Sequence, residues 1–280
     1  MAQAFRAQVS SFLLIAPSNP KSRTCFDTTF ITSEMASQML SESTPLSPDA
    51  ELLALSDVAV RHGFVRKVYG ILGFQLLITT VLGGGIMVCA MQIPSEALMA
   101  ALALSFVGSM AVLCVFACKP EVMRQTPTNY ICLTIFTMAE SVTVGFIGAQ
   151  YTQESVLIAL GITTLIVLSL TLFACQTTYD FAGFGPYLFC ICMCMCGLSF
   201  LLLLASLFGL GGGAFEFLHM VYAALGALLF SMYIIYDTQL IVGGKDKQYC
   251  VDDYCMAAIN IYVDIVKLFL FILQLIGERK

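Results

Sequence analysis

Tyr233-Ile-Ile-Tyr-Asp237-Thr-Gln239 and Ile261-Tyr-Val-Asp264-Ile-Val-Lys267 are two similar phrases that face each other across a short polar turn in the last third of the chain. Each places one aspartate inside an apolar run that is otherwise typical of a membrane helix. A charged aspartate at the centre of such a helix costs about 2.5–3.5 kcal/mol. Two of them on successive helices therefore indicate a coupled pair around which the other helices are arranged.

The composition is that of a membrane protein. Of the 280 residues, 59% are hydrophobic and 11% are charged, whereas soluble domains are about 45–50% apolar and about 25% charged. The net charge of −5 comes mostly from acids in tails and loops, and nothing resembles the basic stripe of a nucleic-acid-binding protein. We therefore predict an all-α polytopic protein whose main partner is the lipid bilayer and which binds no nucleic acid.

A tail of different composition precedes seven apolar runs of about 20 residues, each long enough to cross a hydrocarbon core of about 30 Å. We predict a disordered cytosolic tail over residues 1–60 and a seven-helix membrane domain over residues 61–280. Gly83-Gly84-Gly85 in the first run and Gly226 in the sixth predict close helix approach, because small residues let backbones touch. The predicted spans are Val68–Met91, Ala97–Cys118, Asn129–Ala149, Ser155–Cys175, Tyr187–Phe208, Leu218–Val242 and Tyr254–Ile276.

The distribution of Lys and Arg predicts the orientation, because cytosolic loops carry an excess of these residues. The loops after the first, third and fifth spans contain neither residue, so the N-terminus is expected in the cytosol. Arg279 and Lys280 depart from this pattern, since seven full crossings place them on the other side. Either the last helix is short or re-entrant, or the rule fails at the tail. The predicted cytosolic cations are Arg61, Arg66, Lys67, Lys119, Arg124, Lys245 and Lys247.

Asp237 and Asp264 are predicted to meet near the cytosolic side, because the sixth helix runs into a cytosolic loop and the seventh leaves it. Two carboxylates in contact cannot both ionise cheaply, so such a pair titrates as a unit. With one shared proton the helices hold together; with both groups ionised they repel, and a water-filled path opens. No nucleophile, metal-ligand spacing or water-activating histidine accompanies the pair, so we predict neither an enzyme nor a metal site.

Further ionisable residues lie within or beside the spans: Glu140 in the third, Lys267 in the seventh, and Glu216 at the non-cytosolic mouth of the sixth. Such residues normally face the bundle interior or a water-filled cavity. The alternative for Glu140 is a structural hydrogen bond between helices, with Ser141 and Thr143 as polar neighbours. The alternatives for Lys267 are an ion pair with the aspartate three residues earlier or extension toward the membrane interface.

Four stretches carry a resemblance to a known family: Phe64-Val-Arg-Lys-Val-Tyr69, Met138-Ala-Glu-Ser-Val-Thr-Val-Gly145, Ile234-Ile-Tyr-Asp237-Thr238 and Ile261-Tyr-Val-Asp264-Ile-Val266. With them the chain resembles the transmembrane Bax-inhibitor-motif family, nearest its lifeguard branch, over about residues 62–276. The paired Tyr-Asp and Tyr-x-Asp phrases in the last two helices are the most specific part of the resemblance.

The resemblance implies a seven-helix fold with a short, central last helix surrounded by the other six. It also implies a pH-sensitive calcium leak across Golgi or endoplasmic reticulum membranes that protects from cell death, with calcium as the permeant ion and no cofactor. The family's aspartate pair falls on Asp237 and Asp264, its membrane glutamate on Glu140, and a luminal acidic group on Glu216. Alternative functions are a non-conducting scaffold that binds apoptosis-regulating membrane proteins, and a proton-coupled transporter.

Two positions depart from the family's pattern. Some members pair the aspartates with an arginine at the cytosolic end of the second helix, where this chain has Lys119, which lacks the bidentate fork of arginine. Relatives usually carry a neutral polar residue where this chain has Lys267. A nearby cation favours ionised carboxylates. We therefore predict that Lys119 and Lys267 are gating partners and that the pair opens at lower pH than in relatives.

Overall fold

Helices make up nearly all of the computed structural model, which describes residues 48–90, 95–118, 120–209, 212–243 and 249–280. In these ranges seven long α-helices follow one another, joined by short loops and 3-10 turns, and no strand occurs. The predicted all-α fold with seven helices is therefore confirmed. The helices are α3 (Pro48–Cys89), α4 (Ser95–Cys118), α5 (Thr128–Gly148), α6 (Gln153–Gln176), α7 (Gly185–Leu207), α8 (Gly213–Val242) and α9 (Tyr254–Ile276).

The lengths and hydropathy of these helices are those of a multi-pass membrane protein. Six of the helices described are long and apolar enough to cross a membrane. The remaining one, α4, contributes the shorter apolar stretch Ala100–Phe116. The helix α3 begins at Pro48, so residues 48–60 of the predicted tail are helical, while residues 1–47 lie outside the described part of the chain.

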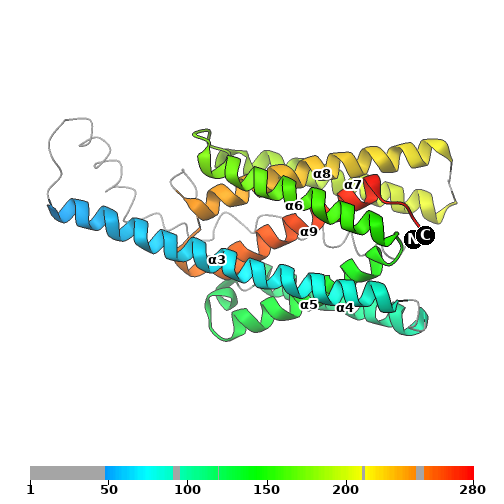
Figure 1. Cartoon of the computed structure of the whole chain (residues 1–280), viewed down its shortest axis with the longest axis horizontal. Coiled ribbons are helices and arrows are strands. Elements are labelled where there is room, and N and C mark those ends of the chain that lie inside the picture. The colour runs from blue at the N-terminus through cyan, green and yellow to red at the C-terminus, as the bar shows by residue number, and fades with distance from the viewer. Residues whose placement is uncertain (1–47, 91–94, 119, 210–211, 244–248) are drawn as a thin grey trace.

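The last helix is the centre of the bundle, as predicted. Figure 1 shows α3, α4 and α5 on one side of α9 and α6, α7 and α8 on the other. In its most apolar window 83% of α9 is buried, against 11% for α6, because α9 packs against α3, α5, α6 and α8. Its 23 residues exceed the 21 of α5 and lie within one residue of α4, α6 and α7, so α9 is markedly shorter only than α3 and α8.

Small residues set the two closest helix contacts. A Cβ atom at Gly145 of α5 would lie 2.8 Å from the carbonyl oxygen of Gly83 in α3. A Cβ atom at Gly226 of α8 would lie 2.5 Å from the ring of Phe271 in α9. The predicted close approach is confirmed at Gly83 and Gly226, whereas a Cβ atom at Gly84 would meet nothing within 4 Å.

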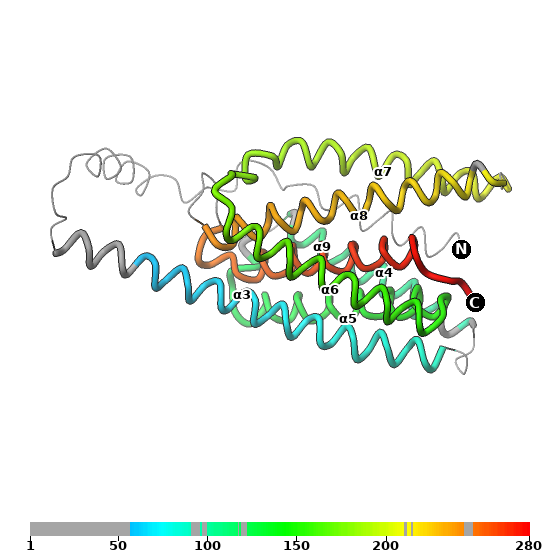
Figure 2. The backbone as a smooth tube through the Cα atoms, turned by 45° about the horizontal axis from the view of Figure 1, so that its top comes forward, coloured from blue at the N-terminus to red at the C-terminus, as the bar shows by residue number. Residues whose placement is uncertain are grey.

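The two ends of the bundle carry different residues. At one end, called here the Arg61 end, Arg61 of α3 hydrogen-bonds the end of α8, and Arg124 pairs with Asp253 just before α9 at 2.7 Å. At the other, the Tyr151 end, Thr152 N–H donates to the Glu278 carbonyl at 3.0 Å. The helix α9 therefore runs from the Arg61 end of the bundle to the Tyr151 end (Figure 2). Arg279 lies beside Tyr151, at the end opposite to Arg61 and Arg124.

Candidate functional site

The two aspartates meet inside the bundle. Asp237 lies in the last two turns of α8, Asp264 lies in the middle of α9, and their carboxyl groups are close enough to interact with each other. Both are buried, with 4% and 2% of their surface exposed. An ionised carboxylate only accepts hydrogen bonds, so two carboxyl groups can bond to each other only when one of them carries a proton. The arrangement is that of two acidic groups in one buried site.

One oxygen of the pair has no hydrogen-bond partner. Asp264 Oδ2 is buried and forms no hydrogen bond within the described residues. A buried polar atom without a partner raises the free energy of the folded state. This oxygen is therefore available to a proton, a water molecule or a cation.

Tyr249 covers the pair from the loop between α8 and α9. Its hydroxyl donates to Asp237 Oδ1 at the long distance of 3.5 Å and accepts a 2.7 Å hydrogen bond from Asn260 Nδ2. Burial, followed by the charge of Asp237, raises the pKa of Tyr249 well above its ordinary value. The phenol therefore stays protonated and remains a donor throughout the neutral range. Sequence reasoning missed Tyr249, because nothing in the loop sequence indicates that it folds back over the helices.

Arg61 ties this loop to α3. Its Nη2 donates to the Leu240 carbonyl at 2.6 Å, its Nη1 to the Tyr249 carbonyl at 2.7 Å, and its Nε to the Val242 carbonyl at 3.1 Å. The last carbonyls of a helix lack intrahelical partners and carry partial negative charge, so a guanidinium is well suited to them. No sequence pattern indicates this contact, since the acceptors are backbone atoms 179 to 188 residues away.

Lys267 has a different partner from the ones the sequence suggested. Its Nζ lies 3.9 Å from Glu140 Oε2 of α5, and only 1% of Lys267 and 3% of Glu140 is exposed. Lys267 forms no salt bridge with Asp264 in the described structure, and its burial excludes extension to the interface. The two local alternatives for Lys267 are therefore wrong. The pair is an ion pair without a hydrogen bond, and Glu140 Oε2 has no hydrogen-bond partner among the described residues.

Hydroxyl groups surround this ion pair. Thr79 of α3 shares a 2.8 Å hydrogen bond with the Tyr262 hydroxyl of α9, and Ser141 of α5 donates to Thr79 at 3.3 Å. One turn nearer the Arg61 end, Gln75 donates to Thr137 at 3.0 Å. Together they make a buried polar column between α3, α5 and α9. The neighbour expected for Glu140, Ser141, belongs to this column.

The remaining predicted site residues do not join the aspartate pair. Glu216 is exposed in the first turn of α8, at the Tyr151 end, far along the helix from Asp237. Lys119 lies outside the described residues. The structure therefore brings together Asp237 with Asp264, and Glu140 with Lys267, as two separate pairs.

Comparison with known proteins shows the family of the chain. The family described as "Inhibitor of apoptosis-promoting Bax1" matches residues 61–280. The chain is 36% identical over 230 residues to human (Homo sapiens) Protein lifeguard 3, covering 80% of this chain and 71% of that protein. It is 37% identical to the mouse (Mus musculus) Protein lifeguard 3 over the same shares. It is 35% identical over 225 residues to Protein LIFEGUARD 4 of Arabidopsis thaliana, covering 79% of this chain and 87% of that protein.

Proposed function

The chain belongs to the family of inhibitors of apoptosis-promoting Bax1, and we propose that it is a pH-sensitive calcium leak channel of an intracellular membrane, Golgi or endoplasmic reticulum. In this role it modulates calcium homeostasis and cell death. The buried contact between Asp237 and Asp264 carries the proposal. Two acidic groups in contact inside a membrane bundle either hold a proton or separate, and the change moves α8 relative to α9.

The gate works through loss of the shared proton. When the proton leaves, two negative charges remain in contact in a poorly solvated site and repel each other strongly. Repulsion drives the end of α8 away from α9 and admits water between them. Tyr249 keeps the pair covered until then, and Arg61 limits how far the end of α8 can move.

The permeation path runs along α9 between the two ends of the bundle. Calcium prefers oxygen ligands, and carboxylates above all. Glu216 at the Tyr151 end, Glu140 in the middle and the aspartate pair supply such oxygens. Lys267 neutralises Glu140, so a cation passes Glu140 only when their contact loosens. Lys119, which lies outside the described residues, remains a proposed gating partner. We place the Arg61 end in the cytosol with the N-terminus because of the Lys/Arg bias.

Calcium efflux from liposomes tests the proposal. The purified full chain is reconstituted in vesicles loaded with calcium and a fluorescent indicator, and efflux is measured at several pH values. We expect efflux that rises with pH for the wild type and that loses its pH dependence in D237N/D264N. The matched control is Asn260→Asp, which adds a carboxylate near the pair without removing either member. Efflux with an unchanged pH response in D237N/D264N contradicts the proposal.

The family description favours a second candidate, a non-conducting scaffold that binds an apoptosis regulator in the membrane. A scaffold keeps its effect on cell death when the aspartates cannot titrate. D237N/D264N therefore separates the two functions when it is tested both in cells and in liposomes. Protection from cell death that survives while reconstituted flux is lost supports the scaffold. Loss of both protection and flux supports the channel.

A further inference from the structure

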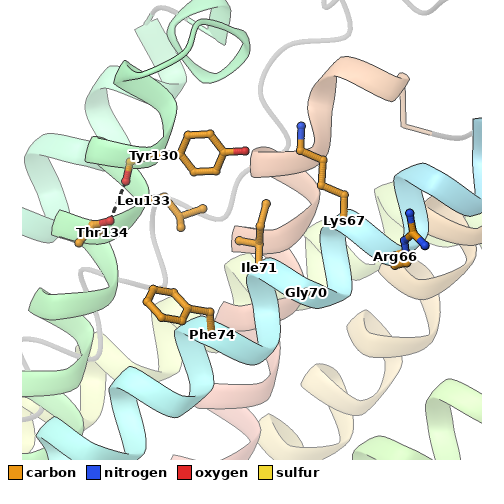
Figure 3. A pocket seen from close by; sticks show the side chains of 8 residues that line it. All are labelled: Arg66, Lys67, Gly70, Ile71, Phe74, Tyr130, Leu133 and Thr134. Atoms are coloured by element: carbon orange, nitrogen blue, oxygen red, sulfur yellow. Dashed lines mark hydrogen bonds between the residues drawn. The ribbon is translucent and has the colours of Figure 1, made fainter.

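A groove opens on the membrane-facing side of the bundle, between α3 and α5 near the Arg61 end. It has a volume of about 340 Å³, and Figure 3 shows its lining side chains. Phe74, Ile71 and Leu133 form its apolar wall, and Gly70 leaves room because nothing lies within 4 Å of where its Cβ atom would be. The full lining is Arg66, Lys67, Gly70, Ile71, Phe74, Tyr130, Leu133 and Thr134.

Charge is confined to one end of this groove. Arg66 and Lys67 are exposed and are followed in α3 by an uncharged run from Val68 to Cys89. The apolar wall begins one turn further along, and Phe74 is 60% exposed. The groove thus passes from cationic to apolar over the first turns of a membrane span, as a bilayer passes from headgroups to acyl chains.

Among the described residues, no carboxylate neutralises the two cations. Neither Arg66 nor Lys67 forms a salt bridge within the described ranges, and the nearby carboxylate of Asp253 is occupied by two hydrogen bonds from Arg124. The ammonium of Lys67 lies 3.2 Å from the centre of the Tyr254 ring, a contact that holds it in place and leaves its charge uncompensated. The rim of the groove therefore attracts an anion.

We propose that this groove binds one anionic glycerophospholipid of the leaflet at the Arg61 end. Its phosphate and headgroup carboxylate lie at Arg66 and Lys67, where the arginine fork suits a phosphate. One acyl chain lies along Ile71 and Phe74. A soluble anion would leave the apolar wall without a contact. Basic pockets between membrane helices on the cytosolic side are suited to anionic headgroups.

A single tryptophan can report the occupant, because the chain contains none. Phe74→Trp in the full chain places the fluorophore in the groove, and vesicles contain either phosphatidylserine or phosphatidylcholine with brominated acyl chains that quench it. The control is Leu168→Trp, at a position on α6 that is 57% exposed. Because a helix rises about 1.5 Å per residue, Leu168 lies about as far from the end of α6 as Phe74 lies from Lys67. The loop after α6, residues 177–184, has no Lys or Arg.

At position 74 we expect brominated phosphatidylserine, present at a low mole fraction, to be preferred over brominated phosphatidylcholine by about tenfold. At position 168 we expect no preference between the two lipids. Arg66→Gln with Lys67→Gln, two exposed substitutions, abolishes the preference at position 74. Equal quenching by both lipids, or a preference that survives in R66Q/K67Q, overturns the proposal. Absence of quenching by either lipid also overturns it, because the groove is then covered by protein. The measurement needs no calcium flux, so it stands or falls independently of the channel.

Discussion

Two buried charge sites lie one turn apart on α9 and are built in opposite ways. Asp264 meets a second acid, Asp237 of α8, whereas Lys267 meets an acid of opposite charge, Glu140 of α5. A like-charged pair is stable only with a proton, so its strength depends on pH. An ion pair is stable only when both members are charged, and breaking it leaves a buried charge without a partner.

The difference divides the bundle into a fixed and a movable half. The helices α3 and α5 hold α9 through the ion pair and through the hydrogen bonds of the polar column. The helix α8 is held at its end by the aspartate pair and by Arg61, which reaches across from α3. We therefore expect a rise in pH to move α8 away from α9 and to leave α5 in place.

The largest effect is expected from breaking the ion pair. Glu140→Gln or Lys267→Met leaves one uncompensated buried charge, which costs about 3–5 kcal/mol of stability. Combining the two substitutions removes both charges and recovers most of that loss. Thermal unfolding of the purified chain in detergent measures the effect, with Asp237→Asn as a control of small effect. Additive losses in the double variant contradict an ion pair.

A side chain at Gly226 is expected to lower the stability of the protein, because α8 and α9 are in close contact there. In Gly226→Ala the new methyl group would lie 2.5 Å from the buried Phe271 ring, and overpacking of this kind costs about 1–3 kcal/mol. Gly84→Ala is the matched control, since a Cβ atom there meets nothing within 4 Å. Unfolding in detergent compares the two. Equal stability of both variants would show that α8 can shift freely along α9.

Removing the Arg61 guanidinium is expected to loosen the end of α8. Arg61→Gln loses up to three hydrogen bonds donated by the charged guanidinium, and water replaces part of them because Arg61 is only partly buried. The Tyr249 amide, which bonds the Leu240 carbonyl at 3.1 Å, should then exchange its hydrogen at least about tenfold faster. Arg61→Lys keeps the positive charge but lacks the forked guanidinium, so its exchange rate should lie between those of the wild type and R61Q. Hydrogen exchange with mass spectrometry measures this rate. An unchanged rate in R61Q would show that Arg61 does not hold the end of α8.

Charges at the ion pair should shift the pH of opening with opposite signs. Lys267→Asn leaves the Glu140 charge near the aspartates, favours their shared proton and moves the midpoint of calcium efflux upward. Glu140→Gln leaves the Lys267 charge, favours ionised aspartates and moves the midpoint downward. Each shift is expected to be about one pH unit, equivalent to about 1.4 kcal/mol, and the double variant should return near the wild type. Shifts of the same sign would contradict a field effect.

The smallest effect is expected at Tyr249. Its hydroxyl donates to Asp237 across 3.5 Å, at the limit of a hydrogen bond. Tyr249→Phe removes a donor that favours the ionised carboxylate, so the efflux midpoint should rise by about a few tenths of a pH unit. Tyr236→Phe, also beside Asp237 but without this hydrogen bond, is the control. A downward shift in Y249F would assign the hydroxyl a different role.

The sequence predicted more of the fold than of the site. Hydropathy alone located the spans, because a helix that crosses lipid must be apolar over its full length. It did not show that α3 begins at Pro48, because residues 48–60 precede the apolar run and carry no membrane signal. Glycines with close neighbours, such as Gly226, were also found, but the sequence did not separate Gly83 from Gly84, whose difference depends on which face of α3 meets α5.

By itself, the sequence determined that Asp237 and Asp264 lie on neighbouring antiparallel helices, since a short loop joins those helices. Only the tertiary structure decided the partners of Lys267 and Arg61. Lys267 lies one turn from Asp264, yet the rotation of α9 turns it toward Glu140 of α5. Arg61 bonds backbone carbonyls, which every sequence contains and which become acceptors only where a helix ends. Partner choice in a helical bundle depends on helix rotation and on helix ends, and both are set by packing.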